Sequence, residues 1–116
     1  MPVSPVDTKW LWRTRRKFVR HVVEVRFNLT RADGKKLGGW MRDISEGGIG
    51  GIVADTLSPG EQVTVEFQLP GQATPIKLNC TIRYSVGTRF GLEFTALNSQ
   101  HRAAILEACD QLQLAD

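Results

Sequence analysis

A regular alternation of apolar and polar residues, repeated in several stretches, is the feature that most constrains the fold of this 116-residue chain. The stretch "QVTVEFQL" at 62–69 and the stretch "IKLNCTIRY" at 76–84 carry an apolar residue at every second position. Successive side chains of a strand point to opposite faces of a sheet, so this period predicts β-strands with one buried face. The same period predicts two further strands, at 23–29 and 90–94.

Two weaker segments complete the expected sheet. The sequence "ADGKK" places Asp33 and Gly34 at the tip of a hairpin, so a segment around Trp40 and Met41 is expected to return antiparallel to the first strand. A short strand is expected near 49–53, after a run of glycines. The six strands predict an all-β fold, either a small barrel or a sandwich. A small six-stranded antiparallel β-barrel is favoured at this length, because a closed barrel leaves no strand edge unpaired.

The spacing becomes helical only near the end of the chain. Apolar residues there recur at three- and four-residue intervals, namely at Ile105, Ala108, Cys109 and Leu112. This spacing predicts one C-terminal helix over about 98–113, capped by Asn98 or Ser99 and packed against the barrel.

The length is typical of a single domain. We expect residues 1–14 to form a flexible basic arm and residues 15–116 to form the barrel domain. No apolar run approaches the roughly 20 residues of a membrane helix, and the N-terminus lacks the apolar stretch of a signal peptide. A cytoplasmic protein without membrane insertion is therefore expected. Cys80 and Cys109 sit in apolar patterns and are expected to be buried free thiols.

Catalytic and metal sites are poorly matched by the residue pattern. Asp43, Ser45 and a histidine are the residue types of a hydrolase triad, but no G-x-S-x-G elbow is present. The cysteines and histidines show none of the usual spacings of metal ligands. The run "GGIGG" has neither the lysine of a phosphate-binding P-loop nor the last glycine of a dinucleotide fingerprint. The sequence therefore predicts a protein that is not an enzyme and holds no metal or cofactor.

Positive charge is concentrated ahead of the first strand. Six lysines and arginines lie between Lys9 and Arg20 with no acid among them, and this favours an anionic partner. Arg16 and Arg20 are four residues apart, and a planar guanidinium can bind a phosphate or the edge or face of a guanine. Composition alone is equally consistent with a solvated basic lead-in.

The stretch "DISEGG" offers complementary groups. Asp43 has the two acceptor oxygens that the N1 and N2 donors of guanine require, and Ser45 can donate to a phosphate or accept from a base. Gly47 and Gly48 would let a ligand ring meet bare backbone. Taken alone, the glycines are also typical of a hairpin turn or a bulge.

These two stretches, in this order, resemble the motifs of the PilZ domain family. The family's R-x-x-x-R motif corresponds to "RKFVR" at 16–20, and its D/N-x-S-x-x-G motif corresponds to "DISEGG" at 43–48. The strand "RFGLEF" at 89–94 also resembles the family's glycine-centred strand. The resemblance extends from about Arg15 to the final helix.

The resemblance implies that the chain binds cyclic di-GMP, a bacterial second messenger, on the outside of the barrel. The residues that it implies for this role are Arg16, Arg20, Asp43, Ser45 and Gly48. Arg15, just before the first motif, is a further candidate for ligand binding, since an arginine there favours a stacked ligand dimer in similar domains. One nucleotide or a stacked pair both stay open.

A switch follows from the same charges. Without ligand the basic lead-in should repel itself, and an anionic ligand would fold it onto the barrel and relay a signal to a protein effector. The role of Trp10 and Trp12 on the arm stays open. Two alternatives remain: a small basic barrel that binds single-stranded RNA or DNA, which is not the first choice, and a PilZ-like adaptor that binds no nucleotide.

Overall fold

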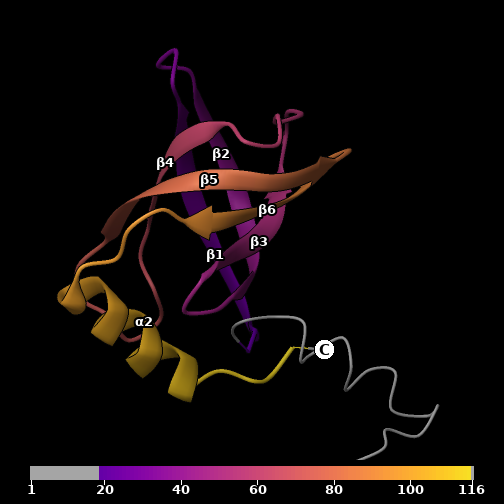
Figure 1. Ribbon diagram of the computed structural model, residues 1–116. Helices are drawn as coiled ribbons and strands as arrows, with labels where there is room; N and C mark the ends of the chain where they lie inside the picture. Colours follow the sequence, from indigo (N-terminus) through magenta and orange to yellow (C-terminus); the bar gives the residue numbers. More distant parts are fainter. Residues whose placement is uncertain (1–18, 116) are drawn as a thin grey trace, which may run out of the picture.

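The computed structural model describes residues 19–115, and six antiparallel strands form a closed barrel within them (Figure 1). Around the barrel the strands follow the order β1-β2-β3-β6-β5-β4. The elements are β1 (His21–Arg31), β2 (Lys36–Ile44), β3 (Gly48–Val53), β4 (Gln62–Phe67), β5 (Ile76–Val86), β6 (Arg89–Phe94) and α2 (Ser99–Asp110). The six-stranded barrel with one C-terminal helix is confirmed. The predicted arm, with Trp10 and Trp12, lies outside the described residues, as do Arg15 and Arg16.

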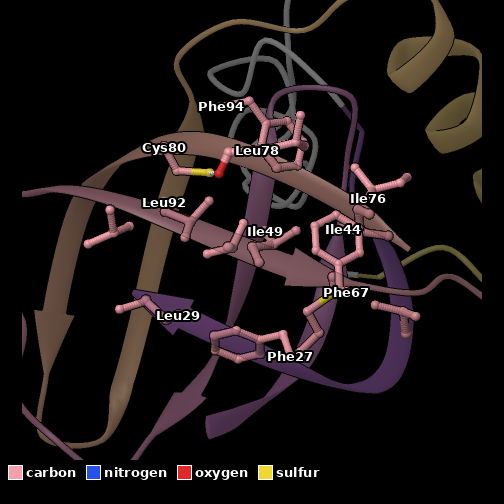
Figure 2. Close-up of a cluster of buried hydrophobic side chains, with 14 of the residues drawn as sticks. Phe27, Leu29, Ile44, Ile49, Phe67, Ile76, Leu78, Cys80, Leu92 and Phe94 are labelled. Carbon is pink, nitrogen blue, oxygen red and sulfur yellow. Dashed lines mark hydrogen bonds between the residues drawn. The ribbon is translucent and has the colours of Figure 1, made fainter. Parts of the chain in front are cut away.

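The inside of the barrel is filled by the apolar side chains of the alternating pattern (Figure 2). Their burial alternates strictly along β4, and Leu29, Val65 and Ile82 are almost completely inaccessible to solvent. The rings of Phe27 and Phe90 contact each other with centroids 5.4 Å apart, which is a favourable tilted aromatic pair. The period of two therefore predicts the core correctly except at Tyr84, which the pattern of 76–84 places inside and which is exposed in the structure, because the register of β5 shifts after Ile82.

Both cysteines are buried free thiols, as expected. Cys80 lies on the inner face of β5, and its Sγ donates weakly to the carbonyl oxygen of Leu78 at 3.6 Å (Figure 2). Burial raises the pKa of the Cys80 thiol to about 12. Burial also raises the pKa of Cys109, as do the nearby carboxylates of Asp110 and Glu46.

Helix α2 packs against the barrel at the end opposite the β1–β2 turn (Figure 1). Three of its side chains, Ile105, Ala108 and Cys109, belong to the buried core. Asn98 is the cap, because its side chain accepts a hydrogen bond of 2.7 Å from the backbone N–H of His101. The helix is shorter than predicted by about three residues at its C-terminal end.

The chain after α2 turns back onto the start of β1. The N–H of Val22 donates to the carbonyl of Gln113 at 2.7 Å, and the N–H of Ala115 donates to the carbonyl of Arg20 at 2.9 Å. These hydrogen bonds therefore fix the backbone of Arg20 and Val22 at the point where the lead-in joins the barrel.

No helix within residues 19–115 has the length and apolar character needed to cross a membrane.

Candidate functional site

Bulges in the barrel align a row of outward-facing residues across five strands. The register shifts between Val22 and Val25 on β1, between Met41 and Asp43 on β2, and between Ile82 and Tyr84 on β5. A bulge changes the direction in which a side chain points. The aligned row, in register across β1, β2, β3, β6 and β5, consists of Val22, Asp43, Gly50, Gly91 and Tyr84. Its end members are exposed, so the row lies on the outer face.

Arg20, which precedes β1, forms an ion pair with Asp43 of this row, between Nη1 and Oδ1. Both side chains are about one quarter exposed. A Cβ atom built on Gly50 would lie 3.0 Å from each carboxylate oxygen of Asp43 and 3.2 Å from Nη1 of Arg20. The pair therefore lies directly over the bare backbone of Gly50, and it joins the last residue of the R-x-x-x-R stretch to the first residue of "DISEGG".

Ser45 shapes the turn between β2 and β3. The buried hydroxyl of Ser45 accepts hydrogen bonds from the N–H groups of Gly47 at 3.1 Å and Gly48 at 3.2 Å. The backbone N–H of Ser45 donates to the carbonyl of Gly48 at 2.9 Å. This is the serine–backbone bonding that stabilises tight turns. The described contacts of the Ser45 hydroxyl are thus all to the turn itself.

Gly48 is needed for the close approach of two strands. A Cβ atom at this position would overlap the carbonyl oxygen of Leu92 on the paired strand β6. Gly47, which is half-buried, accepts a hydrogen bond of 2.9 Å from the N–H of Phe94. Both glycines therefore have a structural role, and their contact with a ligand stays a prediction.

A groove of about 660 Å³ adjoins the row. Its walls are the β2–β3 turn, the bulge of β5, the C-terminal half of β6 and the first turn of α2. The lining residues with charged or aromatic side chains are Arg20, Glu46, Arg83, Tyr84, Glu93, Phe94 and Arg102. The volume lies within the roughly 300–1,000 Å³ of small-molecule sites, so the groove can hold a nucleotide.

Every arginine of the groove has a carboxylate beside it. Arg102 donates to Glu46 at 2.9 Å. The nitrogen–oxygen distance between Arg83 and Glu93 is 3.8 Å, and both of these side chains are about 60% exposed. Because exposed pairs contribute little to stability, an incoming anion can replace the carboxylates. The groove is thus suited to an anion with two oxygens that a planar guanidinium can bind in a bidentate manner, such as a phosphate.

Several residues of the site could not be identified from the sequence. At Gly91 the ring of Tyr84 occupies the space that a side chain would fill. Gly50, Tyr84 and Arg102 were missed. The bulge that turns Tyr84 outward interrupts the alternation without leaving a distinct residue signal, and Arg102 reaches the groove only because α2 packs beside it.

Within residues 19–115, no three histidines, cysteines, aspartates or glutamates come together in an arrangement that could hold a metal ion.

The family model described as PilZ domain matches residues 14–111, which is most of the chain. The chain belongs to the PilZ domain family. The matched part contains both PilZ motifs, and the structure brings Arg20 of the first against Asp43 of the second.

Solved PilZ structures have the same fold. The PilZ domain of YcgR from Escherichia coli, solved with c-di-GMP, gives a TM-score of 0.71 at 17% identity, covering 84% of this chain and 91% of that one. MotI/DgrA, an inhibitor of motility from Bacillus subtilis, gives a TM-score of 0.70 at 22% identity, covering 84% and 50%. An uncharacterized protein of Aquifex aeolicus is 39% identical over 70 residues, which are 58% of this chain and 34% of that protein. The chain thus spans about a third of the Aquifex protein and half of MotI.

Proposed function

We propose that this PilZ domain is a receptor for cyclic di-GMP, which it binds in the groove and over the bare backbone of Gly50. The observation that carries the proposal is the ion pair of Arg20 and Asp43 over Gly50, because it unites the two motifs beside a groove of nucleotide size. The similar domain of YcgR, solved with c-di-GMP, supports the same ligand.

Each group has a chemical role in this proposal. Asp43 accepts from the N1 and N2 donors of a guanine, and Arg20 keeps further N–H donors for a phosphate or a guanine edge. Gly50 lets the base approach the backbone. The β2–β3 turn lies beside Gly50 and is formed by Ser45, Gly47 and Gly48. In this proposal the Ser45 hydroxyl or the backbone of the turn contacts a guanine or a phosphate. Arg15 and Arg16 supply further guanidinium groups from the lead-in.

The proposed output is a change in the lead-in. Residues 1–14 form the arm and residues 15–116 the binding domain. Neutralisation of the arginines by the ligand folds the lead-in over the nucleotide, and the new surface is recognised by a downstream protein in the cytoplasm. In this proposal the domain acts by binding and has no catalytic role.

Calorimetric titration of cyclic di-GMP into the purified protein tests the proposal. Arg16→Ala, Arg20→Ala and Asp43→Ala should each weaken binding by roughly 10- to 100-fold, because each loses a hydrogen bond to a charged group, worth about 1.5–3 kcal/mol. The linear GMP dinucleotide serves as the ligand control, and the measured stoichiometry distinguishes one nucleotide from a stacked pair.

Arg89→Ala is the matched control, because Arg89 is an exposed arginine of β6 outside the groove. It should bind like the wild type. Absence of binding by a folded, nucleotide-free protein would reject the receptor and leave an adaptor that binds no nucleotide. Length-dependent and strongly salt-dependent binding of single-stranded oligonucleotides instead would identify a nucleic-acid-binding barrel.

A further inference from the structure

One ion pair joins helix α2 to the β2–β3 turn, which lies within the second PilZ motif. Nη1 of Arg102, the fourth residue of α2, donates to Oε2 of Glu46 at 2.9 Å. Glu46 lies between Ser45 and Gly47, at a position that the D/N-x-S-x-x-G motif leaves variable. Both side chains line the groove. Neither residue stands at a position that the two motifs specify.

The exposure of the two partners is unequal. The Arg102 side chain is 47% exposed and the Glu46 side chain 22%. An arginine with half of its surface in water keeps N–H donors free for a second acceptor. A half-exposed pair is also weak, since water screens it and two long side chains must be held in place. The contact positions Arg102 at the groove without fixing it there.

We propose that Arg102 is a second anion-binding position of the groove, and that a phosphate of the bound nucleotide replaces the Glu46 carboxylate as its partner. This inference rests on the proposed function. Cyclic di-GMP has two phosphodiester groups, and Arg20 approaches the groove from the start of β1 while Arg102 approaches it from α2. Two arginines on different elements can therefore bind the two phosphates, or the phosphates of two stacked nucleotides.

The exchange has a structural consequence. Ile105, Ala108 and Cys109 hold α2 in the core, so the helix stays on the barrel when the ion pair breaks. What changes is the contact between the start of α2 and the motif turn. Ligand binding therefore changes a contact of the C-terminal helix through the side chain of Arg102. This change is additional to any change in the lead-in.

A double-mutant cycle measured by calorimetry with cyclic di-GMP tests the exchange. Arg102→Ala should weaken binding about tenfold. Glu46→Gln keeps the size of the side chain but removes the competing charge, so it should tighten binding about threefold. In the Arg102→Ala background the Glu46→Gln substitution should have no effect, because no guanidinium is left to be released.

The matched controls are Arg89→Ala and Glu107→Gln, which make the same charge changes at exposed positions outside the groove. They should change the affinity less than twofold. Thermal unfolding of each variant establishes that the barrel is intact.

Three results would overturn the inference: Arg102→Ala binding as tightly as the wild type, Glu46→Gln failing to tighten binding, or an equal gain with and without Arg102. The last result would mean that Glu46 simply repels the ligand. If the wild-type protein itself does not bind, it is the proposed receptor function that fails, so the two failures are distinguishable.

Discussion

Gly48 is the last residue of the second PilZ motif, and its substitution by alanine separates a structural role from a ligand contact. In the structure, the added Cβ would overlap the carbonyl oxygen of Leu92 and lie 3.1 Å from the Cα of Glu93. Both are backbone atoms of β6, held by the pairing of β3 with β6. They cannot rotate away as a side chain would, so the two strands must separate locally.

The expected cost of Gly48→Ala is about 2–3 kcal/mol, toward the upper end for overpacking, because the obstacle is backbone. For a domain of this size that lowers the melting temperature by roughly 10 °C. Thermal unfolding followed by circular dichroism measures the shift. Gly38→Ala is the matched control, since its Cβ would meet nothing within 4 Å. It should be neutral or stabilising by about 0.5 kcal/mol, through the entropy of the unfolded chain.

A Gly48→Ala melting temperature within about 2 °C of the wild type would refute the packing argument. The same variant also tests the motif. If Gly48→Ala is destabilised but binds cyclic di-GMP normally while folded, the motif glycine serves strand packing. If it is fully stable and does not bind, the glycine meets the ligand directly.

Two further predictions concern groups away from the site. Burial raises the pKa of Cys80 to about 12, and Cys109 is buried as well. We therefore expect that neither thiol of the native protein reacts with Ellman's reagent at pH 8 and that both react after unfolding. Fast labelling of the native protein would contradict this. The Glu61 carboxylate accepts two hydrogen bonds from Arg31, at 2.7 and 2.9 Å, and this lowers its pKa below the ordinary 4.5. A carboxyl whose pKa is lower in the folded protein contributes stability above its unfolded pKa and loses it as the pH falls through the folded pKa. The difference in melting temperature between wild type and Glu61→Gln should therefore shrink below pH 4.5. A difference that stays constant from pH 7 to pH 3 would show that the charge of Glu61 does not contribute this stability.

The strands and core could be predicted from the sequence because the alternation is local and strong. Along β4 each apolar residue of "QVTVEF" is buried, and each polar residue faces outward. The shortfall of α2 at its C-terminal end has a different origin, since the chain leaves the helix after Asp110 to pair with β1. That pairing depends on distant residues and leaves no local pattern.

The site could be predicted only where its chemistry coincides with a short motif. Asp43 and Arg20 were identified as candidates from their residue types, and the structure brings them together. Tyr84 and Gly50 share a row with Asp43 only because bulges in β2 and β5 shift the register. A shift of one residue reverses which face a side chain occupies, so period-two reasoning cannot place residues next to a bulge.

The two glycines that follow Asp43 at alternate positions of β3 have different functions, although both lie in the same run. At Gly48 the space that a side chain would fill is occupied by the backbone of β6, so the fold requires a glycine there. At Gly50 the space that a side chain would fill is occupied by the side chains of Arg20 and Asp43, and these can move. A ligand that draws the pair aside would reach the backbone at Gly50, outside the six-residue motif. In the proposed binding mode, the motif would supply the turn and the acceptor at Asp43, while the strand after it would form the surface against which a base lies.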